Sequence, residues 1–407
     1  MGGTGFDLKS CARPNILALQ PYRCARDDYK DDGKITLLDA NENAHGPSLI
    51  GLRDQFLDSI GSKLIKFSGL NRYPDPHQNE LKQLLCDLRQ SPKHSNHLKP
   101  DNLFVGVGSD EAIDALIRCF CVPSVDKILI CPPTYGMYTV ASQINDVEVV
   151  KVPLDVEGES PSFDIRPSSI QEILRSDPRI KLIYICSPGN PTGKLVDQRK
   201  LKYLLEMNNW NGIIVLDEAY IDFAGEGQSL ACWVNDYPNL VVMQTLSKAF
   251  GMAGIRLGFA FAPVEIARLL NNLKAPYNIS SPTSTLATQA VSGPGLTVMS
   301  NHRELIIEQR ARVIQELPRF SKIGRFLGGS DANFLLVEIL NAPKDSGGVP
   351  DNVSAREVYT RLAETKGIVV RYRGDELGCK GCLRITIGTD QETNKLIRKL
   401  GEVFQEI

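Results

Sequence analysis

The residues whose types and spacing most clearly suggest a chemical reaction lie between Thr245 and Arg256. Lys248 follows a strand-like apolar run and stands among small residues and hydroxyl groups, with Arg256 eight positions later. A lysine amine becomes a nucleophile when burial or neighbouring charges lower its pKa, and its common covalent partner in enzymes is a carbonyl carbon. An isolated Ser-Lys pair is more often a surface lysine in a glycine-rich turn, so the interpretation depends on the rest of the chain.

The neighbours of Lys248 suit a phosphorylated aldehyde such as pyridoxal phosphate. Thr245 and Ser247 offer hydroxyl groups, and Arg256 offers a planar fork of donors that matches a phosphate. This stretch therefore predicts a lysine that carries a covalently bound cofactor, with the cofactor phosphate beside these three side chains.

Two further motifs follow apolar runs of the strand type. Asp217 ends one such run, and Tyr220 follows three residues later. A carboxylate there can pair with a protonated pyridine nitrogen, and the tyrosine can reach a ring hydroxyl. Asn190 lies in a tight Gly-Asn-Pro turn that holds its amide in one direction. These residues alone are also compatible with purely structural roles, in which Asp217 is a helix N-cap and Asn190 is an ordinary turn residue.

The turn from Gly106 to Glu111 joins a strand-like run to a helical one, and a helix N-terminus offers free amides to a phosphate. Ser109 and Asp110 lie in this turn, although the serine would also serve as a plain helix cap. Glutamate at position 111 excludes the glycine pattern of a dinucleotide fingerprint. Tyr135, after the next strand, is placed to stack on a flat ring, with burial in the core as the alternative.

The elements that must position these residues alternate between strands and helices. Short runs rich in valine and isoleucine predict strands, and segments with an apolar face predict helices. Such alternation is typical of a mainly parallel sheet covered on both faces, whose ligands gather at the carboxyl ends of the strands. The predicted strands are 103–106, 127–130, 148–152, 181–185, 212–216, 240–243 and 256–261, and the predicted helices are 79–88, 110–121, 135–143, 168–174 and 199–207.

The length of 407 residues exceeds one average core and predicts two domains. We expect an N-terminal arm and part of a small domain in 1–65, a large cofactor-binding domain in 66–300 and a small C-terminal domain in 301–407. Within the first of these, the first thirty residues predict an extended arm. Further expected elements are helices at 47–60, 301–320, 354–365 and 391–404, strands at 334–338, 368–371 and 383–387, and a surface loop at 341–352.

Composition limits the classes of function. Hydrophobic residues make up 42% and charged residues 23%, as in an ordinary soluble globular protein. A formal net charge of -2 leaves no basic footprint for nucleic acid or an anionic membrane, so small molecules are the expected partners. No apolar run is long enough to span a bilayer, and no signal pattern is recognised at the N-terminus. The expected location is therefore cytoplasmic.

The ten cysteines are scattered singly or in loose pairs, which predicts reduced thiols. Cys379 and Cys382 form a C-x-x-C pair, but no second pair lies nearby to complete a zinc site, and the setting is not that of a thioredoxin. Chance is the preferred explanation of this pair. The five histidines show no metal spacing, so no metal is expected.

Taken in order along the chain, these motifs resemble the fold-type I pyridoxal-phosphate-dependent aminotransferases of class II, and more narrowly the histidinol-phosphate aminotransferase family. The resemblance covers nearly the whole chain. It implies an α/β fold with a large, mainly parallel seven-stranded sheet and a smaller α+β domain. The residues that carry it are Asn190, Asp217, Tyr220, Lys248 and Arg256, together with the segments 21–22, 38–43, 71–75, 131–138, 332–334 and 381–388.

The resemblance also implies a role for each residue around the cofactor ring. Lys248 would form the internal aldimine with pyridoxal 5'-phosphate and then move a proton between substrate carbon and cofactor. Asp217 would pair with the pyridine nitrogen, Asn190 and Tyr220 would bind the ring hydroxyl, and Tyr135 would stack on the ring.

Phosphate and substrate contacts follow from the same resemblance. Tyr73 would reach the cofactor phosphate from the partner subunit, which implies a homodimer. Arginine forks bind either a phosphate or a carboxylate, which suits two substrates that share one site. The remaining phosphate contacts are expected from Ser109, Asp110, Thr245, Ser247 and Arg256, and the substrate contacts from Tyr22, Asn41, Arg371 and Arg384.

The implied activity is a ping-pong transamination that exchanges the amino group of L-histidinol phosphate with 2-oxoglutarate, giving imidazole acetol phosphate and L-glutamate in histidine biosynthesis. The cofactor residues are equally compatible with another class II aminotransferase that acts on aromatic amino acids, or with a threonine-phosphate decarboxylase. A cofactor-binding regulator without turnover is disfavoured, because Lys248, Asp217 and both arginines are retained and no basic DNA-binding domain is present.

Overall fold

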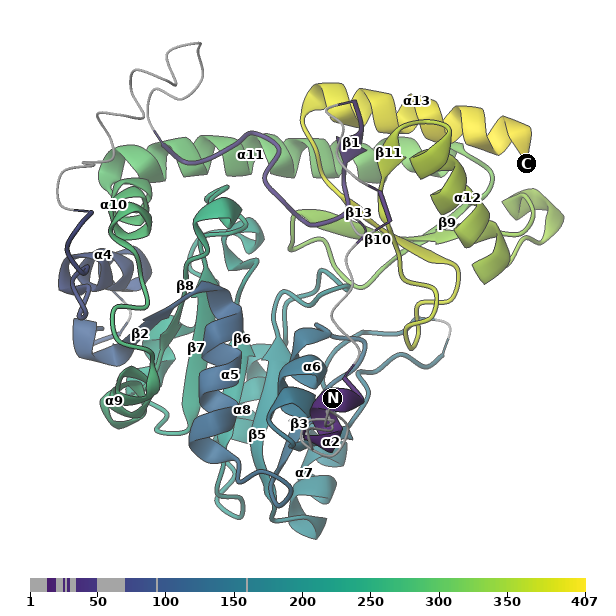
Figure 1. The fold of residues 1–407 in the computed structure, drawn as a ribbon. Coiled ribbons are helices and arrows are strands. Elements are labelled where there is room, and N and C mark those ends of the chain that lie inside the picture. Colours follow the sequence, from purple (N-terminus) through teal and green to yellow (C-terminus); the bar gives the residue numbers. More distant parts are fainter. Residues whose placement is uncertain are drawn as a thin grey trace, which may run out of the picture.

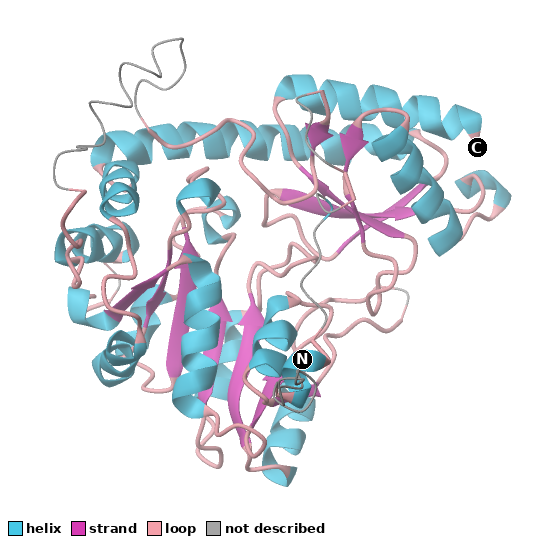
Figure 2. Cartoon of the chain, in the orientation of Figure 1, coloured by secondary structure: helices cyan, strands magenta, loops and turns pink. Residues whose placement is uncertain are grey.

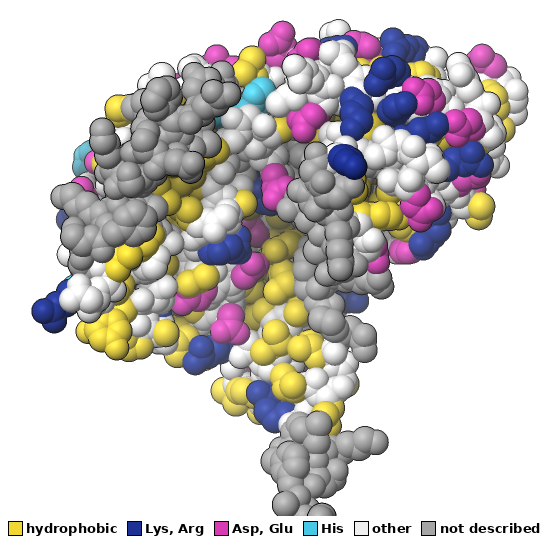
Figure 3. Space-filling view, turned by 45° about the horizontal axis from the view of Figure 1, so that its top comes forward, with side chains coloured by type: hydrophobic (Ala, Val, Ile, Leu, Met, Phe, Trp, Pro, Cys, Tyr) yellow, Lys and Arg dark blue, Asp and Glu magenta, His cyan; other side chains and the backbone are white. Residues whose placement is uncertain are grey.

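The computed structural model describes residues 13–19, 25, 28–29, 34–49, 70–92, 94–158 and 160–407. The side chain of Tyr22 and most of the helix expected over 47–60 lie outside the described residues, and 47–49 is not helical. No helix in the described ranges is long and apolar enough to cross a membrane. On the face shown in Figure 3, basic and acidic side chains lie side by side, so neither sign dominates that face.

A seven-stranded sheet forms the larger part of the fold (Figure 1). Its order is β2-β8-β7-β6-β5-β3-β4, in which β8 is antiparallel to both neighbours and the other paired strands are parallel. The predicted mainly parallel sheet is thus confirmed, and its strand ends differ from the predicted ones by at most two residues. The strands are β2 (Leu103–Gly106), β3 (Lys127–Ile130), β4 (Glu148–Lys151), β5 (Ile180–Cys186), β6 (Ile213–Asp217), β7 (Leu240–Thr245) and β8 (Gly258–Phe261).

Helices cover both faces of this sheet (Figure 2). Successive strand residues point to opposite faces, so Leu182 and Val215 enter one core, while Ile183 and Leu216 enter the other. Burial on both faces explains why the strands are apolar throughout. The first core includes residues of α5 (Gly108–Phe120), α6 (Met137–Ile144) and α9 (Val264–Leu273), and the second includes residues of α4 (Asn79–Arg89), α7 (Pro167–Ser176) and α8 (Gln198–Leu205).

A four-stranded antiparallel sheet, in the order β12-β13-β10-β9, forms the smaller part. The strand predicted over 368–371 was wrong. It is two strands in different sheets, because β11 pairs with β1 of the N-terminal arm whereas β12 pairs with β13. The elements are β1 (Thr36–Leu37), β9 (Ile323–Leu327), β10 (Phe334–Ile339), β11 (Ile368–Val369), β12 (Arg371–Tyr372), β13 (Cys382–Thr386), α12 (Asn352–Glu364) and α13 (Asp390–Glu406).

A long helix, α11 (Gly293–Glu316), joins the two parts, running from beside α10 (Ser281–Ala290) to the smaller sheet (Figure 1). It begins earlier than the predicted 301 because a proline in its first turn, flanked by glycines, is compatible with a helix start. The helix is continuous through residue 300, where the sequence predicted a domain boundary, and the boundaries themselves stay a prediction. Among the described residues of the arm, 14–17 form a short helix, α2 (Pro14–Leu17).

Candidate active site

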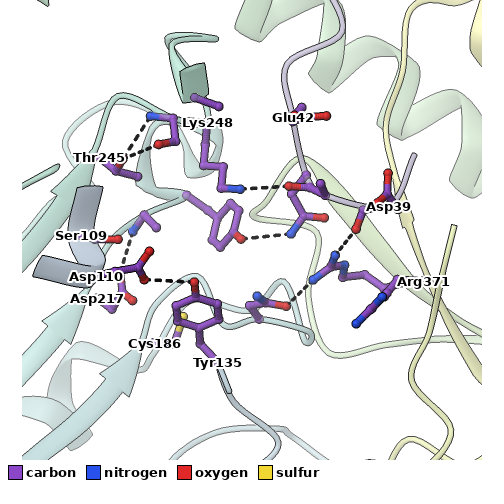
Figure 4. A pocket seen from close by; sticks show the side chains of 18 of the residues that line it. Asp39, Glu42, Ser109, Asp110, Tyr135, Cys186, Asp217, Thr245, Lys248 and Arg371 are labelled. Carbon is purple, nitrogen blue, oxygen red and sulfur yellow. Dashed lines mark hydrogen bonds between the residues drawn. The ribbon is translucent and has the colours of Figure 1, made fainter. Parts of the chain in front are cut away.

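A cavity of about 250 Å³ opens at the carboxyl ends of β5, β6 and β7. Its walls come from the large sheet, the N-terminal arm and the smaller sheet (Figure 4). This is where ligands of mainly parallel sheets gather. Of the residues predicted for the site, those that line the cavity are Asn41, Ser109, Asp110, Tyr135, Asn190, Asp217, Tyr220, Thr245, Ser247, Lys248, Arg256, Arg371 and Arg384.

Lys248 lies in the turn that follows β7, and its side chain extends into the cavity (Figure 4). Its Nζ donates a hydrogen bond of 3.0 Å to the carbonyl oxygen of Ala40 and lies 5.7 Å from the centroid of the Tyr220 ring. Burial, and next the positive charge of Arg384, lower the pKa of Lys248 to about 8. A lysine with such a pKa is a far better nucleophile near neutral pH than an exposed one.

Asp217 is the last residue of β6 and is 2% exposed. Its carboxylate accepts hydrogen bonds from the Tyr138 hydroxyl at 2.7 Å and from the amide of Ala219 at 3.2 Å. Burial raises the pKa of Asp217 to about 6, although the Tyr138 bond acts in the opposite direction. No helix follows Asp217 directly, so it is a buried acid at the cavity floor and not a helix N-cap.

The start of α5 forms a small cradle with Arg256. Gly108 has φ +73°, a backbone conformation that favours glycine, and an added Cβ would lie 2.5 Å from Nη2 of Arg256. Ser109 lies within the first turn of α5 and not at its cap, which is Val107. The first-turn amides of a helix and an arginine together form a site for an anion.

Two hydroxyl groups complete this end of the cavity. Thr245 and Ser247 place their Oγ atoms 2.8 Å apart, and Thr245 donates to the carbonyl of Leu257 at 2.9 Å. Asp110 accepts from the Tyr135 hydroxyl at 3.2 Å, while its other oxygen lies 3.5 Å from Arg256 Nη2. The carboxylate of Asp110 thus connects the arginine with the aromatic ring.

Asn190 and Arg384 are bonded to each other. Nη1 of Arg384, a residue that is 4% exposed, donates to the amide oxygen of Asn190 at 2.7 Å, and Nη2 donates to the carbonyl of Asp39. The arginine therefore links the large sheet's turn to the N-terminal arm. It comes from β13, and its guanidinium lies 5.3 Å from the ring centroid of Phe334.

Asn41 is another link between the arm and the large sheet. Its amide nitrogen donates to the Tyr220 hydroxyl at 3.0 Å, and its amide oxygen accepts from Thr386 at the same distance. Asn41 has φ +55°, a left-handed conformation that asparagine tolerates better than most residues. The Tyr220 hydroxyl thus accepts a hydrogen bond from Asn41, and its own proton remains available for donation to another acceptor.

Of the two tyrosines expected near the phosphate and the substrate, only Tyr73 lies among the described residues. Tyr73 is 82% exposed, stacks on Tyr277 with ring centroids 4.6 Å apart, and does not line the cavity. Tyr22 lies outside the described residues.

The sequence predictions missed several cavity residues. Tyr138 was also missed: it does not line the cavity, but its hydroxyl donates to Asp217 from behind the lining residues, and it lies in the segment 131–138 that carries the resemblance. Arg373 alternates with Arg371 along an extended segment, which was a second available signal. Three other missed lining residues, Asp39, Ala40 and Glu42, belong to the segment 38–43 that carries the resemblance. The remaining ones have no local sequence signal and are Ala25, Cys186, Ala219 and Ala253.

The described residues contain no group of three histidine, cysteine or acidic side chains that could hold a metal ion. Cys379 and Cys382 are buried free thiols that pack in one apolar cluster with Phe163, Leu327 and Leu336. Burial raises the pKa of Cys379 to about 12 and also raises that of Cys382. The C-x-x-C pair therefore has the surroundings of inert core cysteines.

Comparison with known proteins places this geometry in a family. The family model "Aminotransferase class I and II" matches residues 33–400. The chain is 51% identical to the histidinol-phosphate aminotransferase of Candida maltosa over 409 residues and 47% identical to that of Saccharomyces cerevisiae over 410, covering 99% of each chain. A crystal structure of histidinol-phosphate aminotransferase from Sinorhizobium meliloti with pyridoxal-5'-phosphate shares the fold at a TM-score of 0.78, with 20% identity and 98% coverage of both chains. The chain belongs to the class I and II aminotransferases.

Proposed function

We propose that this chain transfers the amino group of L-histidinol phosphate to 2-oxoglutarate, giving imidazole acetol phosphate and L-glutamate. The observation that carries the choice of substrate is the identity of 47–51% to three fungal relatives named histidinol-phosphate aminotransferase, over 98–99% of the chain. The cavity supports the reaction class, because it combines a lysine of lowered pKa with a buried carboxylate and several arginines.

The cavity residues fit pyridoxal 5'-phosphate, the cofactor of this family. The guanidinium of Arg256 lies close to Gly108 at the start of α5, and with Thr245 and Ser247 this cradle offers the donors that a phosphate requires. Asp217, a buried acid that lines the same cavity, would hold the pyridine nitrogen. We assign Tyr135 to the ring face, and Asn190 and Tyr220 to the ring hydroxyl.

When bound, the cofactor supplies an electron-withdrawing ring that accepts the charge of a substrate carbanion. Lys248 supplies the proton chemistry: with a pKa of about 8, part of its amine is neutral near pH 7. Its Nζ takes the proton from the α carbon of the amino substrate and returns a proton later. The carbonyl of Ala40, 3.0 Å away, holds the amine in the cavity when it is not engaged.

Arginines bind the acidic ends of the substrates. Arg371 and Arg384 lie opposite each other on β12 and β13, so their side chains come from neighbouring positions of one sheet. Arg384 is held in place by Asn190, which gives its guanidinium a fixed direction. Both substrates are anions, and an arginine fork matches a carboxylate or a phosphate.

A homodimer in the cytoplasm is the state we propose for the working enzyme. The exposed Tyr73, which does not line the cavity of its own subunit, supports a role at the cofactor phosphate of a partner subunit. The eight described cysteines are free thiols, which supports a reducing compartment.

The first test is a half-reaction without any keto acid. Purified protein loaded with pyridoxal phosphate is mixed with histidinol phosphate, and loss of the visible absorption band of the covalently bound cofactor is followed. We expect rapid bleaching with histidinol phosphate and slow bleaching with phenylalanine. Bleaching only by another amino acid would retain the fold and cofactor but assign a different aminotransferase activity.

A further inference from the structure

A second cavity, of about 490 Å³, adjoins the first. Four residues line both cavities, namely Tyr135, Asn190, Arg371 and Arg373, so they form a shared wall. The second cavity carries three basic side chains and one acidic one: Lys151, Arg371, Arg373 and Glu376. The second cavity is thus a mainly basic pocket that adjoins the cavity into which Lys248 extends.

Arg373 is placed in this wall by the strand geometry. Successive side chains of an extended segment alternate, so Arg371 and Arg373 lie on one side and Tyr372 on the other. Tyr372 accordingly packs against the guanidinium of Arg356, whose Cζ lies 4.1 Å from the centroid of the tyrosine ring. The amide of Arg373 donates to the carbonyl of Cys382 at 2.9 Å, which fixes the backbone beside β13.

The guanidinium of Arg373 has unused donors. Nη1 donates to Glu376 at 2.6 Å, and the side chain is 18% exposed. Nε is buried and meets no acceptor in the part of the chain that the structure describes. A guanidinium carries five N–H groups, and leaving a buried donor unpaired is unfavourable. Nη2 also meets no acceptor among the described residues, so this guanidinium retains a donor for an acceptor that a ligand would supply at the cavity wall.

We propose that Arg373 is a specificity-determining residue that binds the phosphate of the phosphorylated amino substrate at the wall shared by the two cavities. This inference rests on the proposed function. It goes beyond the two arginines, Arg371 and Arg384, that the family resemblance assigns to substrate.

The chemistry of the two substrates explains why a third arginine is useful. Two carboxylates of 2-oxoglutarate or glutamate can be held by Arg371 and Arg384, one arginine each. A phosphate carries up to two charges and three acceptor oxygens, and therefore takes more donors than a carboxylate. Glu376 neutralises part of the charge of Arg373 and holds its Nη1, which directs the remaining edge of the guanidinium away from the ion pair.

The test uses the loaded enzyme with Arg373→Gln and two ligands that differ only in the phosphate, histidinol phosphate and histidinol. Apparent dissociation constants come from the concentration dependence of the half-reaction. We expect Arg373→Gln to weaken the binding of histidinol phosphate about 10- to 100-fold, the range for a lost charge-assisted hydrogen bond. The binding of histidinol should be weakened much less. Arg373→Lys should recover part of the loss, because it restores charge without the fork.

Arg356→Gln is the matched control, since this arginine lies on the other side of Tyr372 and pairs with Asp375 at the surface. Equal losses for histidinol and histidinol phosphate in Arg373→Gln, or no loss for either, would overturn the inference while leaving the proposed function intact. If the unmodified enzyme does not react with histidinol phosphate, the proposed function and the inference fail together.

Discussion

The two walls of the active cavity are built differently. The large-sheet wall, which consists of Ser109, Asp217, Thr245, Ser247 and Lys248, comes from strand ends and the start of α5. Within it, Asp217 accepts from Tyr138, and Thr245 is bonded to Ser247 and to the backbone of Leu257. Opposite this wall lies the substrate-facing wall, defined as residues 39–42 with Arg371, Arg373 and Arg384, which comes from the arm and the smaller sheet.

This difference matches what each wall has to bind. In the function proposed above, the large-sheet wall meets one unchanging cofactor, for which fixed donors and acceptors are suitable. The substrate-facing wall would accept two chemically different anions in turn, and arginine forks suit both. Hydrogen bonds join the arm and the smaller sheet to the large-sheet part, among them those from Lys248 to Ala40, from Arg384 to Asn190 and from Asn41 to Tyr220. Changes in the large-sheet wall should therefore affect both half-reactions alike, whereas changes in the other wall should separate them.

The largest expected effect is that of Lys248→Ala. The variant should fold, lose the visible band of covalently bound cofactor and lose turnover by about 10⁴-fold or more, because nucleophile and proton carrier are one group. Both half-reactions should fall together. Lys202→Ala, an exposed lysine paired with Glu206 on α8, is the control. Ordinary turnover in Lys248→Ala would remove the basis for the assignment.

Asp217→Asn should have the next largest effect. The amide cannot stabilise a positive ring nitrogen, so both half-reactions should slow by about 10²- to 10³-fold, the scale of a lost preorganised electrostatic contact. Single-turnover rates with histidinol phosphate and with glutamate measure this directly. Asp236→Asn, at the surface beside His94, controls for loss of a carboxylate. A loss confined to one substrate would contradict the division between the walls.

Much of the large-sheet wall could be predicted from the sequence for a physical reason. A strand buried on both faces must be apolar, so the polar residue that ends it is easily seen. Asp217 after β6 and Thr245 at the end of β7 are examples. The chain order of such strands also predicts that their carboxyl ends meet, and the structure brings these residues to one cavity.

The substrate-facing wall was harder to predict because it depends on contacts between distant segments. The pairing of β1 with β11 involves two residues in each strand, too few to show any periodicity. Arg373 has the same residue type as many surface arginines, and only its strand neighbours place it in a cavity wall. Helix α10 was missed since its small and polar residues give little apolar pattern, although Ser280 caps it by accepting from the amide of Thr283.

A stability measurement examines the large-sheet wall without its cofactor. The pKa of Lys248 is depressed to about 8 from 10.5, so its stability contribution is complete above pH 10.5 and is lost as pH falls through about 8. Lys248→Met removes this loss. We therefore compare the free energy of unfolding of the variant apoprotein with that of the wild-type apoprotein. The difference, variant minus wild type, should rise by about 1–3 kcal/mol as the pH falls from about 10 to about 7. Denaturant unfolding at several pH values measures it, and a difference that does not change with pH would contradict the depressed pKa.

The smallest expected effect is that of a substitution at Tyr73, which belongs to neither wall of its own subunit's cavity. Tyr73 is exposed and stacked on Tyr277, and we propose that its hydroxyl donates to the cofactor phosphate of the partner subunit. Tyr73→Phe keeps the ring and its stacking but removes that donor, so cofactor affinity should fall about 5- to 20-fold, as for one lost hydrogen bond to a charged group. Equilibrium titration of apoprotein with pyridoxal phosphate measures the change, with Tyr277→Phe as the control for the aromatic pair. Unchanged affinity in Tyr73→Phe, with the dimer intact by sedimentation, would show that the large-sheet wall binds the phosphate with residues of its own subunit alone.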